Sequence, residues 1–207
     1  MKVKGPRAYR MGARADSAAE THQRIIDAAI RRLGEHLYDD VSLSTIAADA
    51  GVTVQTVLRR FGSKEGLSEA ATVVALEEVR RARWSAAEGD LEAAMRSLCE
   101  HYEAWGERSL RFLSQEERVP AMGRVTDVGR ALHHEWVEHV FAASLTATPR
   151  GARGRLRAQL IAATDVHVWK IVRRDLGLDA RATEKTMREL VLAVVARAEN
   201  VVRGGKS

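Results

Sequence analysis

The chain has 207 residues, of which 45% are hydrophobic and 29% are charged, with three prolines and one cysteine. This composition can bury a sizeable core, and it favours long helices over a turn-rich β-sandwich. It excludes an intrachain disulfide, which fits a reducing compartment. No apolar run reaches the roughly 18–20 residues of a membrane span, and the start lacks the apolar stretch of a secretory signal. We therefore expect an all-α, cytoplasmic protein that does not enter a membrane.

The net charge of +5 is concentrated near the amino terminus. Residues 1–64 carry 11 Lys and Arg against 7 Asp and Glu, whereas residues 65–207 carry 22 against 21. The first 14 residues hold five bases and no acid and show no hydrophobic period, so residues 1–15 are predicted to be a disordered basic arm. Such an arm either attracts a polyanion or only keeps the chain soluble.

The first predicted helix follows this arm. Apolar residues from Ile25 to Leu33 recur along the stripe of one helix face. Asp16 or Ser17 can cap its first turn. The pattern breaks at Gly34.

Two shorter helices follow, joined by a tight turn. Ser42 is predicted to cap the first of them, and Gly51 to end it, because a residue without Cβ adopts the left-handed turn conformation. Thr53 is predicted to cap the next helix, and Gly62 to end it. Two short helices around a tight turn are typical of a helix-turn-helix.

Longer helices, separated at glycine or proline, fill the rest of the chain. Their predicted spans are 63–86, 90–104, 107–117, 121–146, 153–175 and 180–202. The last one carries apolar residues on three- and four-residue steps, namely Met187, Leu190, Val191, Val194, Val195, Ala198, Val201 and Val202. Such a seam packs either on the core of its own chain or on a second copy of it.

The helix-turn-helix residues form a recognisable motif. Its parts are Ala28-Ala29, Ser44-x-Ile46-Ala47, Ala50-Gly51-Val52, Thr56, Phe61 and Ser63-Lys64-Glu65-Gly66-Leu67. With these spacings, the segment between His22 and Leu67 resembles the DNA-binding domain of the tetracycline-repressor (TetR) family. The resemblance covers about a quarter of the chain.

This resemblance implies a homeodomain-like, three-helix DNA-binding domain over residues 16–64. It also implies a helical ligand-binding and dimerisation domain over residues 65–207, whose last two helices form a homodimer. The function it implies is that of a transcriptional repressor, released from a near-palindromic double-stranded operator by a small hydrophobic effector. The alternative is a DNA-binding regulator that needs no effector and has no ligand cavity.

The predicted DNA contacts lie on the arm and on the two short helices. A recognition helix presents its first residues to base edges, where Gln55 can pair with adenine and Val54 can contact a thymine methyl. Side-chain hydroxyls, backbone N–H groups and the charged groups of Lys and Arg can hold phosphates. The complete set is Lys4, Arg7, Arg10, Ser42, Ser44, Thr45, Thr53, Val54, Gln55, Thr56, Arg59, Arg60 and Lys64. For Thr53, helix capping is an equally good role.

The sequence departs from the family at three positions. Leu58 and Arg60 stand where the family usually has tyrosine and histidine, and Leu37 stands where it tends to have glycine. Leu58 cannot make a hydroxyl–phosphate bond, so we assign it no DNA contact. Arg59 and Arg60 can replace that bond electrostatically.

Candidate effector contacts lie on the inward stripes of the body helices. They are Met95, Cys99, Tyr102, Trp105, Phe112, Met122, His133, Trp136, Phe141, Thr164 and His167. Each aromatic residue among them fits an ordinary core equally well. Thr164 and His167 interrupt an apolar stripe, and a buried polar group there needs a partner.

No enzyme, cofactor or metal site is predicted. The run His133–His139 resembles a zinc motif, but His134 and His139 are five residues apart and do not share a helix face. No phosphate-binding glycine motif and no paired nucleophile and base occur at catalytic spacing.

Overall fold

The computed structural model describes residues 6–86 and 89–204, with side chains for 17–86 and 89–200. Its elements are α1 (Pro6–Glu35), the 3-10 turn η1 (Tyr38–Asp40), α2 (Leu43–Asp49), α3 (Val54–Phe61), α4 (Lys64–Arg83), α5 (Leu91–Leu113), α6 (Pro120–Val140), α7 (Ala142–Ala147), α8 (Arg150–Ala163), α9 (Val166–Lys170), the π-helical turn η2 (Ile171–Asp175) and α10 (Ala180–Gly204). These ranges contain no strand, which confirms the all-α fold class.

The predicted starts of the two short helices are confirmed. The hydroxyl of Ser42 accepts from the backbone N–H of Thr45, and that of Thr53 accepts from Thr56. Gly51 and Gly62 have φ values of 66° and 75°, the left-handed conformation expected at both helix ends. The sequence therefore placed α2 and α3 correctly.

The first helix differs from the prediction. Helix α1 begins at Pro6, so neither Asp16 nor Ser17 caps it and residues 6–15 are helical instead of forming an irregular arm. Proline fits the first turn of a helix, and the alanines and arginines that follow favour helix without an apolar period. Hydrophobic spacing alone therefore missed this part of α1.

The sequence predicted a break between two helices at Gly106. In the structure Gly106 lies inside α5. A Cβ on Gly106 would meet ring atoms of Trp169 at 2.5–2.9 Å. Trp169 is fully buried in the core of the body. The glycine is therefore explained by the close approach of an indole ring from α9.

Two predicted long helices are each broken in two. Helix α6 ends at Val140 and α7 starts at Ala142, while α8 ends at Ala163 and α9 starts at Val166. At the second break the Asp165 side chain caps α9 by accepting from the N–H of His167. Aspartate is a good cap, so one apolar stripe can continue across two helices.

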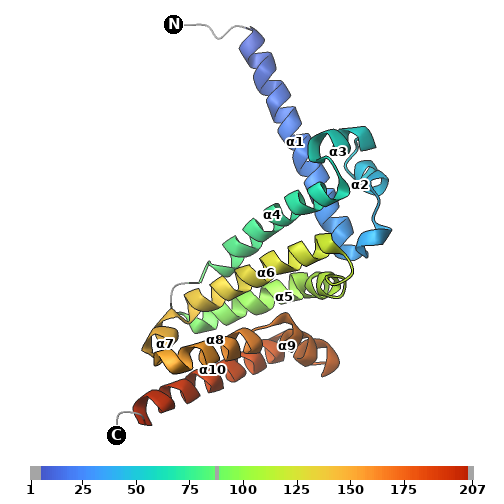
Figure 1. Ribbon diagram of the computed structural model, residues 1–207. Coiled ribbons are helices and arrows are strands. Elements are labelled where there is room, and N and C mark those ends of the chain that lie inside the picture. Colours follow the sequence, from blue (N-terminus) through green and yellow to red (C-terminus); the bar gives the residue numbers. More distant parts are fainter. Residues whose placement is uncertain (1–5, 87–88, 205–207) are drawn as a thin grey trace, which may run out of the picture.

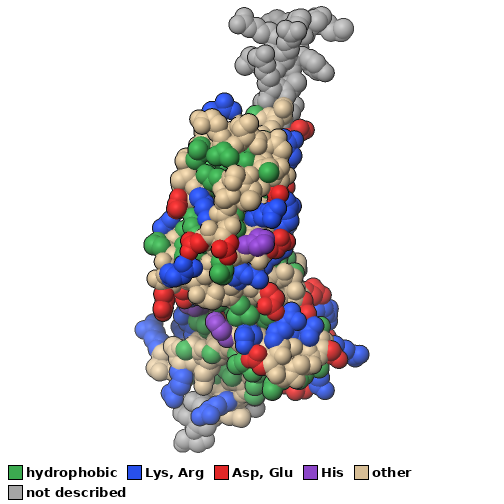
Figure 2. All heavy atoms as spheres, turned by 90° about the vertical axis from the view of Figure 1, so that its right-hand side faces the viewer, with side chains coloured by type: hydrophobic (Ala, Val, Ile, Leu, Met, Phe, Trp, Pro, Cys, Tyr) green, Lys and Arg blue, Asp and Glu red, His purple; other side chains and the backbone are tan. Residues whose placement is uncertain are grey.

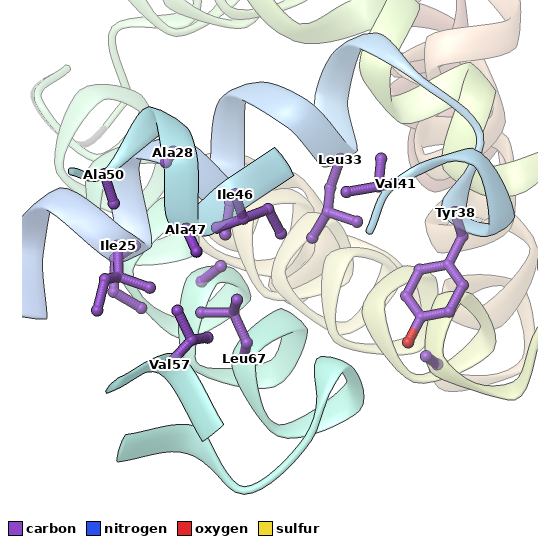
Figure 3. Packing of buried hydrophobic residues seen from close by; sticks show 14 of the residues in the cluster. Ile25, Ala28, Leu33, Tyr38, Val41, Ile46, Ala47, Ala50, Val57 and Leu67 are labelled. Atoms are coloured by element: carbon purple, nitrogen blue, oxygen red, sulfur yellow. The ribbon is translucent and has the colours of Figure 1, made fainter. Parts of the chain in front are cut away.

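The buried apolar residues form two clusters. The first unites α1–α4, where Ile25, Ile46, Val57 and Leu67 converge (Figure 3). It also includes Met122 of α6, so the amino-terminal helices share their core with the body. The second cluster joins α5 and α6 to α7–α10. No gap in packing separates residue 64 from residue 65.

The molecule is elongated, with α1–α3 at the upper end in Figure 1 and α8 and α10 at the lower end. Helix α4 runs from the first group toward the middle of the body. At about 1.5 Å per residue, its 20 residues span about 30 Å. None of the helices in the described ranges is long and apolar enough to cross a bilayer.

Candidate functional site

The first turn of α3 forms an exposed edge of the amino-terminal domain. Thr53, Val54 and Gln55 are exposed, whereas Val57 is completely buried and anchors the helix on α1 and α2. The Thr53 and Thr56 hydroxyls lie 3.0 Å apart, and Thr53 also caps the helix. Amide groups of a helix start and short polar side chains are thus presented together, as major-groove recognition requires.

The start of α2 presents a second group of hydroxyls. The Ser42 and Ser44 oxygens are 2.7 Å apart, and the Thr45 hydroxyl donates to the Ser42 carbonyl over 2.8 Å. All three residues are exposed. These hydroxyls already bond to one another and to the Ser42 carbonyl, so a phosphate bound here would compete with those bonds for their protons.

The predicted basic contacts differ in their surroundings. Arg59 is exposed and makes no ion pair within the described part of the chain, whereas Arg60 is half-buried and its Nε has no acceptor there. The Lys64 ammonium lies 4.0 Å from the centre of the Tyr38 ring and donates to the Tyr38 carbonyl. Burial lowers the pKa of Lys64. Its position favours a structural role over the expected phosphate contact.

Three residues of the predicted arm lie outside what the structure describes. Lys4 precedes the described residues, and the side chains of Arg7 and Arg10 are not described.

Figure 2 shows acidic and basic side chains interspersed over one face of the molecule. Phosphate attraction there would have to come from local groups and not from a broad basic patch.

Arginines of α1 hold α2 in place, a role that the sequence analysis missed. Arg32 pairs with Asp49 at 2.6 Å, and Arg31 reaches the same carboxylate at 3.3 Å. The Arg32 hydrogen bond lowers the pKa of Asp49 to about 2. Arg24 donates to the Ala50 carbonyl at the end of α2 over 3.2 Å. These bonds fix α2 against α1, next to the exposed start of α3.

A cavity of about 700 Å³ opens between α4, α5 and α6 and reaches Ile30 and Leu33 of α1. Six of the predicted effector contacts line it: Tyr102, Trp105, Phe112, Met122, His133 and His167. The cavity therefore touches both the body and the amino-terminal domain. The premise of the alternative hypothesis, a body without a cavity, is wrong.

The other five predicted contacts lie outside this cavity. Met95, Cys99, Trp136 and Phe141 belong to the second core cluster, and Thr164 is completely buried. Burial raises the pKa of the Cys99 thiol to about 12. The prediction that these five residues line the cavity is therefore wrong, because an inward stripe does not tell which residues meet neighbours and which meet a void.

The polar end of the cavity includes Arg83 and His101, which the sequence analysis did not single out. Arg83 is 4% exposed and donates from Nη2 to Nδ1 of His133 over 3.0 Å. Burial, then the charge of Arg83, lower the pKa of His101 to about 3 and that of His133 to about 4. Both rings are therefore neutral near pH 7. In the sequence Arg83 follows Arg80 and Arg81, so nothing local distinguishes it from these arginines.

Comparison with known proteins agrees with this geometry. The pattern described as "Bacterial regulatory proteins, tetR family" matches residues 25–71. The HTH-type transcriptional regulatory protein RaaS of Mycobacterium tuberculosis is 43% identical over 65 residues, a match that spans 31% of this chain and only 30% of that protein.

Two crystal structures resemble the whole fold. A transcriptional regulator from Rhodococcus sp. aligns with a TM-score of 0.67 at 16% identity, covering 86% of this chain and 97% of that one. A TetR-like regulator from Rhodococcus sp. RHA1 aligns with 0.60 at 16% identity, covering 85% and 96%. Residues 25–71 are therefore similar to the DNA-binding domain of bacterial regulatory proteins of the tetR family, and the rest of the chain shares the fold of such regulators.

Proposed function

We propose that this protein is a cytoplasmic, homodimeric repressor that leaves a near-palindromic operator when a small effector fills the cavity. The exposed edge of α3, Thr53 to Thr56, carries this proposal, because it combines hydrogen-bonding side chains with the positive end of a helix. Regulators of this family are not enzymes, and we assign the chain no catalytic role.

The proposed DNA contacts include exposed and half-buried residues of α2, α3 and their first turns. Gln55 reads a base, Val54 contacts a thymine methyl, and Thr53 and Thr56 hold phosphate. Further phosphate contacts come from Ser42, Ser44, Thr45, Arg59 and Arg60. Lys4, Arg7 and Arg10 remain candidates for an adjacent minor groove. We leave Lys64 out because its ammonium already contacts Tyr38.

The proposed effector acts through α4. This helix starts beside α3, at Lys64, and ends at Arg83, which lines the cavity. An effector shifts the balance between two dimer shapes only by binding one of them better, typically by about 1–3 kcal/mol. Movement of α4 would then change the distance between the two recognition helices of a dimer.

The proposed dimer uses the lower end of the molecule in Figure 1. Part of the apolar seam of α10 packs on the core of its own chain, where Met187 and Val191 are completely buried. Leu190 and Leu192 remain 44% and 47% exposed. We therefore place the contact with a second copy on the outward sides of α8 and α10.

Selection of bound fragments from a random DNA pool by the full chain tests the regulator proposal. We expect inverted half-sites whose centres are about 34–36 Å apart, one turn of DNA. Recovery of fragments without shared sequence, or of single half-sites only, would refute the symmetric reading mode. Fluorescence anisotropy with the selected fragment then measures affinity with and without candidate effectors.

A further inference from the structure

The buried end of the cavity carries a positive charge without a matching negative one. Arg83 is 4% exposed, and its Nε has no acceptor among the described residues. Its recorded contacts are the hydrogen bond to His133 and the face of Trp136, whose ring centre is 4.5 Å from the guanidinium carbon. A buried charge is costly unless an opposite charge compensates it.

The neighbours of Arg83 do not supply that charge. His133 accepts from Arg83 at Nδ1 and has the Thr164 hydroxyl 3.1 Å from Nε2, and Thr164 donates in turn to the Leu160 carbonyl. This chain of hydrogen bonds consists of neutral groups. Tyr102 donates its own hydroxyl to the Thr164 carbonyl over 2.8 Å.

The two carboxylates that line the cavity already have partners. Glu116 pairs with Arg130 at 2.7 Å, and Asp165 accepts from both the backbone and the ring of His167. Most of the arginines that do form ion pairs lie at the surface, as Arg124 does in its pair with Glu69. Arg83 therefore combines deep burial with a missing carboxylate partner.

The remaining wall is mainly apolar. Residues such as Leu76, Val79, Leu110 and Leu113 line it together with the aromatic rings. Cavities of roughly 300–1,000 Å³ hold drug-sized ligands, so the volume here suits a molecule with a substantial apolar body. A ligand that fits both ends must be amphipathic.

We propose that the cavity binds an amphipathic organic monocarboxylate, whose head pairs with Arg83 and whose apolar body lies between α4, α5 and α6. A guanidinium matches a carboxylate in geometry as well as in charge, and the low-polarity surroundings strengthen the pair. This inference rests on the proposed effector site and names the class of ligand it takes.

Carboxylates paired with their own primary amides test it, because each pair differs only in the charge of the head. Dodecanoate with dodecanamide, and 2-naphthoate with 2-naphthamide, are titrated into the full chain and followed by calorimetry. We expect at least one carboxylate to bind ten-fold or more tightly than its amide. Equal affinities within both pairs, or no binding of either carboxylate, would overturn the proposal.

Variants on α4 link the preference to the residue. Arg83→Met should abolish the preference for the carboxylate and raise the melting temperature of the ligand-free protein, because an apolar side chain replaces an uncompensated charge. Arg83→Lys should keep a preference, since it keeps the charge. Arg81→Met, at an exposed position of the same helix, should change neither property. Preference retained in Arg83→Met would contradict the assignment.

The outcome is separable from the regulator proposal, because these titrations need no DNA. A carboxylate that binds through Arg83 but leaves operator affinity unchanged would refute effector release and support the site. Loss of operator recognition in every condition would refute the repressor and not the ligand class.

Discussion

At the level of single residues, the absence of a side chain at Gly106 lets α9 pack closely on α5. The indole of Trp169 in α9 occupies the space that a Cβ at position 106 would need. The indole Nε1 also donates to Glu103 of α5 over 3.0 Å. Both contacts fasten α9 to α5. Packing therefore explains why position 106 is a glycine, although glycine has a low helix propensity.

Gly106→Ala should lower the free energy of unfolding, although alanine favours helix by about 1 kcal/mol over glycine. The new Cβ would lie 2.5 Å from a rigid, buried ring, and relieving the overlap costs typically about 1–3 kcal/mol. Gly154→Ala in α8 is the matched control, because nothing lies within 4 Å of its Cβ. Urea unfolding should show the two variants shifted in opposite directions.

Gln55→Ala should weaken binding to the selected operator by about 1–3 kcal/mol and relax specificity at one position of each half-site. The reason is the loss of hydrogen bonds to a base edge from an exposed side chain that the fold does not use. Anisotropy titrations with operator and random fragments measure both effects. An equal loss on the two DNAs would contradict base reading.

His133 should make the protein less stable in mild acid. Its folded pKa of about 4 is below the ordinary value of 6.5, so below pH 6.5 the unfolded chain binds a proton that the folded chain does not. The contribution is complete above pH 6.5 and falls by about 2 kcal/mol at pH 5. Denaturant unfolding at pH 7 and pH 5 should show a smaller loss for His133→Gln. The same loss in both proteins would exclude this histidine as the cause.

At the scale of elements, the segment between α5 and α6 binds the segment between α1 and α2. The buried Gln115 side chain accepts from the Tyr38 backbone N–H over 2.8 Å and donates to the Arg111 carbonyl. Arg111 in turn donates to the Gly34 carbonyl. Side chains of the body thus take the place of water at the backbone of Gly34 and Tyr38, and they hold the α1–α2 connection against the body.

Gln115→Leu should destabilise the protein by about 1–3 kcal/mol, because it leaves the buried Tyr38 N–H without an acceptor. Thermal unfolding monitored by circular dichroism measures the change. Glu117→Leu, at an exposed position of the same segment, should have little effect. A Gln115 variant as stable as the parent would show that water replaces the lost bond.

At the scale of the whole molecule, the two domains of the sequence are one packed unit. Val119 and Met122 of the body are buried in the same cluster as Ile25 and Val57 of the DNA-binding domain. The cavity also extends to Leu33. A change in the shape of the cavity therefore acts on packed side chains and not through a loose linker.

Leu190→Glu should convert the proposed dimer to monomers while leaving each chain folded. Leu190 is 44% exposed in the single chain, so a carboxylate there is tolerated until a second copy covers it. Sedimentation equilibrium measures the mass, and Val73→Glu on α4, which is 59% exposed, is the control. A Leu190 variant that stays dimeric would place the interface elsewhere.

Caps, glycine turns and helical periodicity are local signals, so they were enough to predict the fold class, the positions of α2 and α3, and the similarity of the amino-terminal helices to the TetR DNA-binding domain. The sequence did not place the start of α1, where helix propensity acts without an apolar period. The sequence also did not show that Tyr102 lines the cavity while Trp136 does not, because both lie on inward stripes. Which side chains meet neighbours and which line a cavity depends on helices that are distant in sequence, so it is visible only in the folded chain. For the same reason the tertiary structure alone showed that Arg83 is buried without a carboxylate.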